Sequence, residues 1–186
     1  DKLTFSAHIR SATKKAYSKS ILLSRCFLSR SPKLLTAAFT SYVRPLLEYA
    51  SPVWSPHLIK DIDAIEKVQR RFTKSFPNLR DLPYPIRIAR LHIVPLGERR
   101  SNIDLITSYR ILNNLVHHTS FQFFTLRTHN LTRGHSLILS KPKVRLNVSK
   151  FSFYSRVVDP WNLLPDRVVS AGTLPTFKFL LKTLHL

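Results

Sequence analysis

The segment from residue 60 to 76, KDIDAIEKVQRRFTKSF, most constrains the fold, because at 3.6 residues per turn it forms a helix with two opposed faces. Five residues with helical spacing make a face that we expect to pack in a core: Ile62, Ile65, Val68, Gln69 and Phe72. Four cations follow the same spacing on the other face, where we expect no acid among them: Lys67, Arg70, Arg71 and Lys74. In many proteins a face of this kind is simply the solvated side of a surface helix. Features elsewhere in the sequence are therefore needed to judge whether this face binds an anion.

The chain carries a large excess of positive charge. It has 30 Lys and Arg against 10 Asp and Glu in 186 residues, a formal net charge of +20. Neither residues 2–47 nor residues 105–158 contain an acid. A field of this sign binds polyanions, so nucleic acid is the expected partner and an anionic membrane surface is the alternative. A membrane-surface protein would gather its charge on one amphipathic helix, whereas here the cations occur on several segments, which favours nucleic acid.

Helical spacing of apolar residues recurs along most of the chain. It predicts further helices over residues 6–28, 32–46, 86–91, 98–117 and 174–184. Ser31 followed by Pro32 is typical of a helix start, and Pro45 should kink the second helix. The fold class is therefore expected to be mainly α.

Prolines and a change of period predict the domain organisation. Residues 1–76 form a helical bundle, and the proline-rich connector 77–97, with one short helix, is the expected hinge. Residues 98–186 form a smaller C-terminal α+β part. Within it, residues 135–158 alternate apolar and polar side chains, which predicts two or three short strands.

Cations elsewhere give further candidate binding residues. Lys14 and Lys15 lie on the first basic helix. Arg99 and Arg100 fall in the first turn of helix 98–117, where the helix dipole disfavours cations, so a bound anion is expected to compensate them. Together with Arg133 and His135 of the LTRGHS turn they form a predicted second anion-binding patch; the alternative is a surface loop without a ligand.

The sequence contains no constellation typical of a catalytic or metal site. Its few glycines provide no phosphate-binding loop, and its histidines lack the partners of a zinc site. Asp61 and Asp63 are better explained as the acidic first turn of a helix than as metal ligands. We expect no cofactor and no small-molecule substrate. The single cysteine, Cys26, lies in an apolar run, so we expect it in the core of an intracellular protein without disulfides.

Seven segments, in order, carry a family resemblance that covers almost the whole chain. They are KLTFSAHI from Lys2, YVRPLLEYASPVWSP from Tyr42, IDAIEKVQRRFTKSF from Ile62, VPLGERRSNIDLITSYRIL from Val94, LTRGHSLIL from Leu131, FYSRVVDPWNLLPDRVVSA from Phe153 and the final TFKFLLKTL. In this order they resemble the C-terminal part of a non-LTR retrotransposon reverse transcriptase of the Jockey or chicken-repeat type, an RNA-directed DNA polymerase.

The resemblance implies which part of such a polymerase this chain is. In the family, the paired aspartates of the palm end shortly before the sequence that matches Asp1, so the catalytic residues and their Mg²⁺ would lie outside this chain. The chain would then be the non-catalytic thumb, with a C-terminal extension. Its expected partners are RNA, DNA or an RNA·DNA duplex and the palm of its own polypeptide. Its expected location is a nuclear and cytoplasmic retrotransposon ribonucleoprotein.

Overall fold

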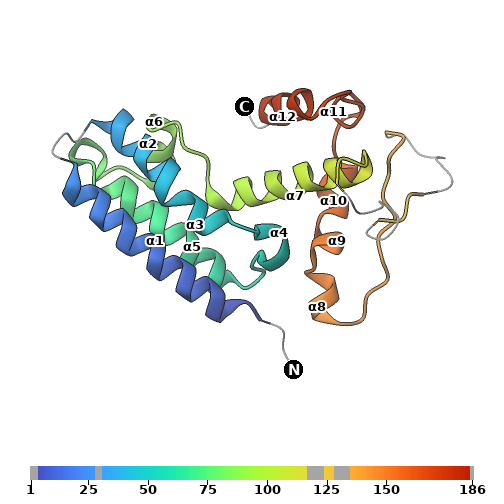
Figure 1. The fold of residues 1–186 in the computed structure, drawn as a ribbon, viewed down its shortest axis with the longest axis horizontal. Helices are drawn as coiled ribbons and strands as arrows, with labels where there is room; N and C mark the ends of the chain where they lie inside the picture. Colours follow the sequence, from blue (N-terminus) through green and yellow to red (C-terminus); the bar gives the residue numbers. More distant parts are fainter. Residues whose placement is uncertain (1–3, 28–30, 117–123, 128–134, 185–186) are drawn as a thin grey trace. The chain divides into compact units, whose positions relative to one another are not determined.

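The computed structural model describes residues 4–27, 31–116, 124–127 and 135–184. This part of the chain is mainly helical, as predicted (Figure 1). The chain divides into two compact units, Asp1–Arg100 and Ser101–Leu186, and the division falls inside a helix, α7 (Leu96–Leu112).

The first unit is a helical bundle. Its helices are α1 (Ser6–Cys26), α2 (Pro32–Tyr42), α3 (Arg44–Glu48), α4 (Ser51–Trp54), α5 (Ile59–Lys74), α6 (Tyr84–Arg90) and the first turn of α7, with a short 3-10 helix at Pro77–Leu79. Helices α1, α2, α5 and α6 begin close to the predicted positions, whereas the short helices α4 and Pro77–Leu79 were not predicted. The predicted kink appears as a break between α2 and α3, with Pro45 in the first turn of α3, where its missing N–H removes no helical hydrogen bond. Ser31 is the N-cap of α2, as predicted.

The apolar face of α5 packs in the core of this unit. Ile65, Val68 and Phe72 are buried, and the Phe72 ring stacks on Phe39 of α2 at 4.1 Å between centroids. Burial of each such side chain contributes about 1.5–3 kcal/mol. Ile62, one turn before Ile65, was also predicted to face the core. It is 37% exposed, so this part of the prediction is wrong.

The connector expected at residues 77–97 belongs to the first unit. Leu79, Leu91 and Ile93 are buried in the same core as the helices before them. Its prolines stand at the start of the 3-10 helix and of α6, where a proline fits without strain. The position of the prolines predicted a hinge, whereas the apolar residues between them attach the segment to the bundle.

The second unit contains the rest of α7 and a series of short helices. They are α8 (Asn147–Lys150), α9 (Phe153–Arg156), α10 (Val158–Asn162), α11 (Asp166–Val169) and α12 (Leu174–Thr183). Three aromatic side chains form the centre of its core, since Tyr109 stacks on Phe177 at 4.3 Å and Phe177 on Trp161 at 6.1 Å.

The short strands predicted for residues 135–158 are not supported. In the described part of this unit the β-structure consists of one isolated antiparallel bridge, between Leu126 and Leu139. Further along, the backbone N–H of Lys150 bonds to the carbonyl of Leu146 at 3.0 Å, so this stretch closes helical turns. Leu146 is 70% exposed, so the apolar positions of the alternation do not form one buried face. Cys26, expected in the core, is also exposed, at the last residue of α1.

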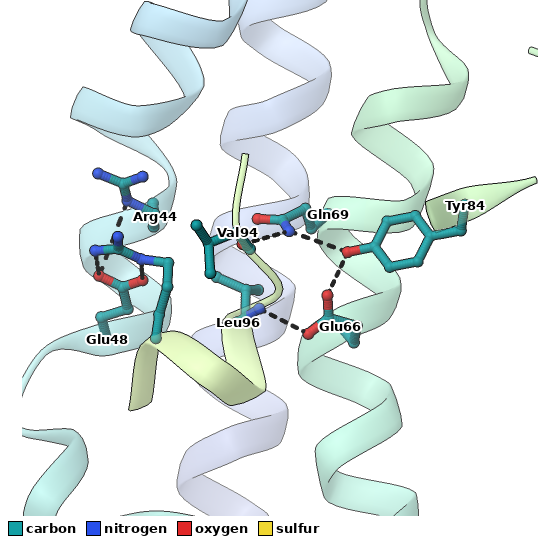
Figure 2. Close-up of polar contacts among 8 residues, drawn as sticks. Arg44, Glu48, Glu66, Gln69, Tyr84, Val94 and Leu96 are labelled. Atoms are coloured by element: carbon teal, nitrogen blue, oxygen red, sulfur yellow. Dashed lines mark hydrogen bonds and ion pairs between the residues drawn. The ribbon is translucent and has the colours of Figure 1, made fainter. Parts of the chain in front are cut away.

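A buried polar network holds α5, α6 and the start of α7 together (Figure 2). The Tyr84 hydroxyl donates to Glu66 Oε1, and the Leu96 N–H donates to Glu66 Oε2 at 3.0 Å. Gln69 Nε2 donates to the Tyr84 hydroxyl at 3.0 Å and to the Val94 carbonyl at 3.1 Å. Burial, followed by the hydrogen bond to Glu66, raises the pKa of Tyr84 above its usual value. The network therefore stabilises the neutral phenol.

We predict that Tyr84→Phe lowers the free energy of unfolding by about 1–3 kcal/mol, because it leaves buried groups of Glu66 and Gln69 without this partner. The raised pKa also gives a pH signature. Above about pH 10 the unfolded chain loses the Tyr84 proton while the native state keeps it, so the stabilisation present at lower pH is lost as the pH rises. Urea unfolding as a function of pH should show a smaller decline in stability for Tyr84→Phe than for the unmodified chain. An equal decline in both proteins would show that Tyr84 does not cause the loss of stability at high pH.

Candidate nucleic-acid interface

Helices α1 and α5 run side by side and in the same direction (Figure 1). Near their starts, Ser6 Oγ donates to Asp61 Oδ2 at 2.6 Å. Nearer their ends, the Arg71 guanidinium lies over the ring of Tyr17, 4.8 Å from its centroid. The two contacts are 11 residues apart on α1 and 10 on α5, so the helices keep nearly constant register between them.

A groove of about 260 Å³ lies between these two helices. Its lining consists of four cations, one aromatic ring and three smaller side chains: Arg10, Lys14, Lys67, Arg71, Tyr17, Thr13, Ala64 and Val68. We call it the α1/α5 groove. It brings together residues more than 50 positions apart in the sequence, from both of the basic helices.

The cations of the groove are available to a ligand. Arg10 and Lys14 are one helical turn apart on α1, as are Lys67 and Arg71 on α5, so each pair extends about 6 Å along its helix. All four residues are exposed. None of them makes an ion pair with another residue that the structure describes. Four like charges in one groove repel each other, and a polyanion would relieve that repulsion.

The other two cations of the predicted basic face of α5 do not line the groove. Arg70 Nη1 pairs with Asp63 Oδ1 at 2.6 Å, and its guanidinium lies over Tyr84 at 5.4 Å. The expectation that no acid lies on this face is therefore wrong. Asp63 and Arg70 are two helical turns apart on the same side, a spacing visible in the sequence. Lys74 is exposed in the last turn of α5.

Lys15 lies on the opposite flank of α1. It lines a second, wider groove of about 710 Å³ together with Lys14, Lys19 and Leu46 of α3. Lys14 lines both grooves. The two predicted lysines of α1 therefore belong to different surfaces that meet at Lys14.

Arg99 has its anion inside the protein. Its Nε and Nη2 donate to the two carboxylate oxygens of Glu48 at 2.5 and 2.9 Å, and Arg44 Nε lies 3.9 Å from the same carboxylate (Figure 2). The hydrogen bond to Glu48 raises the pKa of Arg99, whereas burial and the neighbouring Arg99 charge lower the pKa of Arg44. A protein carboxylate thus compensates the cation that we expected a bound anion to compensate.

The two other described members of the predicted second patch, Arg100 and His135, are buried. Arg100 is buried, at 4% exposure. His135 is buried in the other unit, with its Nε2 3.2 Å from the Trp161 carbonyl oxygen and its ring edge-on to the Trp161 ring. Arg133 lies outside the described residues. The described part of the chain therefore gives the second patch no support.

Among the groove residues missing from the predicted site are one of its four cations, Arg10, and its aromatic residue, Tyr17. Their helical spacing was visible in the sequence, because Arg10 is four residues before Lys14 and Tyr17 is three residues after it. This spacing places the three residues on one helix face. The sequence did not show that this face adjoins Lys67 and Arg71.

No metal site and no membrane span are seen in the described residues. Among them, no three His, Cys, Asp or Glu side chains are grouped so that they could hold a metal ion. No helix there is long and apolar enough to cross a bilayer.

Comparison with known proteins gives a partial match. An uncharacterized protein of Caenorhabditis elegans is 29% identical over 119 residues, which are 62% of this chain and 60% of that protein. The match thus spans about three fifths of the relative. No family model matches the chain. No solved structure matches it either.

The contacts predict opposite phenotypes for two arginines. Arg99→Gln should lower the free energy of unfolding by about 1–3 kcal/mol, because the partly buried Glu48 loses its two-pronged partner. Arg71→Gln, on the exposed helix face, should change stability by less than about 0.5 kcal/mol. The affinity for a polyanion should decrease in Arg71→Gln and stay unchanged in Arg99→Gln. Urea unfolding and heparin affinity of both variants would measure this, and equal effects on binding would contradict the assignment.

Proposed function

We propose that this chain binds nucleic acid through the α1/α5 groove, as the non-catalytic thumb and C-terminal part of a retrotransposon reverse transcriptase. The groove itself carries the proposal, because it gathers Arg10, Lys14, Lys67 and Arg71 from two helices and gives them no protein carboxylate as a partner within the described residues. The family resemblance of the sequence supports the assignment to a polymerase.

Contacts to the phosphate backbone would supply the affinity. Lysine and arginine neutralise phosphates and release the counterions condensed on the nucleic acid, so binding of this kind depends steeply on salt and little on sequence. The large net charge of the whole chain adds a long-range attraction that speeds encounter. RNA, DNA and an RNA·DNA duplex all present the required phosphates.

Two alternatives remain: an unrelated basic scaffold that binds nucleic acid, and a protein of anionic membrane surfaces. A membrane-surface helix displays cations on one side and buries apolar side chains in the bilayer on the other. Here the apolar sides of α1 and α5 are packed in the core, through Ile9 and Ile65 among others, so they are not available to lipid. Tighter binding to phosphatidylserine vesicles than to nucleic acid at the same charge concentration would favour the membrane.

The proposal assigns catalysis to a palm domain that would be the main protein partner, with Mg²⁺ bound there and not in this chain. The setting would be a ribonucleoprotein of nucleus and cytoplasm. We predict that the purified chain neither extends a primer nor cleaves nucleic acid when Mg²⁺ or Mn²⁺ is added, because two-metal chemistry requires clustered carboxylates. Metal-dependent extension or cleavage, measured on labelled primer-template, would overturn this part of the proposal.

Replacement of the four groove cations by glutamine tests the binding proposal. In Arg10→Gln, Lys14→Gln, Lys67→Gln and Arg71→Gln combined, each lost phosphate contact should flatten the plot of log K against log salt concentration by roughly 0.9 on duplex DNA. The total change in slope should be about three to four. Helix content should persist, because glutamine is nearly as good a helix former as lysine or arginine.

A matched control separates the groove from the overall charge. Lys143, Arg145, Lys178 and Lys182 are exposed residues of the second unit, and their replacement by glutamine removes the same charge. Their variant should keep the slope of the unmodified chain and lose only the weaker long-range attraction. If both variants lose the same slope, the chain binds through diffuse charge and the groove is not its site.

A further inference from the structure

The α1/α5 groove combines cations with an aromatic ring and an apolar floor. Tyr17 is 36% exposed and carries the Arg71 guanidinium over its ring. Ala64 and Val68 are its apolar lining residues, which we call its floor, and Val68 also belongs to the buried core. A phosphate gains nothing from an apolar floor or a ring, whereas a base gains from both, since aromatic rings and guanidinium planes are the surfaces on which unpaired bases stack.

From this composition we infer that the groove takes an unpaired nucleotide, whose base stacks on the Arg71 guanidinium held in place by Tyr17. The inference rests on the proposed function and narrows it from nucleic acid in general to strands with unpaired bases. The bases of a duplex are already stacked inside it, so a duplex meets the groove only through its phosphates. An unpaired strand places its phosphates against Lys14 and Lys67 and its base against Arg71.

Tyr17 acts as a positioning residue in this arrangement. An arginine side chain on a helix surface samples many rotamers, and the attraction between its charge and the ring face holds it in one of them. The guanidinium is thereby ordered before the nucleotide arrives, which lowers the entropy cost of binding. Arg71 itself is exposed, so a ligand can reach it from solvent.

The lining predicts that this stacking tolerates any base. No amide or carboxylate side chain lines the groove, and these are the usual readers of adenine and cytosine edges. The Thr13 hydroxyl is already used, donating to the Ile9 carbonyl at 2.8 Å in its own helix. Arginine and lysine can read a guanine edge, but in this arrangement the groove cations face phosphates or take part in the stack. Stacking therefore serves all four bases, because every base has a π face.

Arg71→Lys tests the inference, because it keeps the charge and removes the plane. Affinity would be measured by fluorescence anisotropy on a short single strand and on the blunt duplex of the same sequence. In Arg71→Lys, single-strand affinity should fall about tenfold, the worth of one stacked base, while the salt slope stays unchanged because the charge remains. Duplex affinity should stay the same. Loss on both substrates alike, or on neither, would overturn the inference.

Two variants of Tyr17 complete the test. Tyr17→Phe keeps the ring and should bind the single strand as the unmodified chain does, whereas Tyr17→Leu should lose the same affinity as Arg71→Lys. If Tyr17→Leu destabilises the bundle, seen as a lower melting temperature, Arg71→Lys alone decides. If Arg71→Lys has no effect while the four-glutamine variant loses its salt slope, the stacking inference fails and the proposed function stands. If neither Arg71→Lys nor the four-glutamine variant affects binding, both the stacking inference and the proposed function fail.

Discussion

The packing of α1 against α5 is the contact on which the candidate site depends. Ile9 and Ala16 of α1 and Ile65, Val68 and Phe72 of α5 belong to one buried cluster, and the apolar surface removed from water holds the two helices together. The cations that flank these buried stripes are then forced to face each other across the groove. Their mutual repulsion opposes the packing, so core burial has to offset it when no polyanion is bound.

Much of the fold could be predicted because a long amphipathic helix shows its period over several turns. The bounds of α1, α5, α6 and α12 follow from apolar spacing and from proline positions. Even the burial of Gln69 was apparent from its place on the apolar face of α5. Helices of four or five residues, such as α8, span little more than one turn and have no period to display. Alternation of apolar residues in that region therefore predicted strands that are not supported.

The site was harder to predict because the fate of a cation depends on partners far along the chain. Arg99 and Glu48 are 51 residues apart, and nothing local to Arg99 shows that a carboxylate reaches it. His135 looked like a loop residue, whereas its ring packs beside Trp161, 26 residues further on. The positions of Lys14, Lys67 and Arg71 on helix faces could be read from the sequence. That these faces adjoin depends on how the helices pack.

Lys14 belongs to two surfaces at once, since it lines the α1/α5 groove and the wider groove beside α3. One ammonium group cannot fully neutralise two phosphates that approach from opposite flanks of the same helix. If the chain binds nucleic acid as proposed, a strand on one flank would therefore weaken the binding of a strand on the other, and this coupling would be reciprocal. The shared lysine would thus make binding at the two flanks of α1 negatively cooperative, so that one strand at a time is favoured.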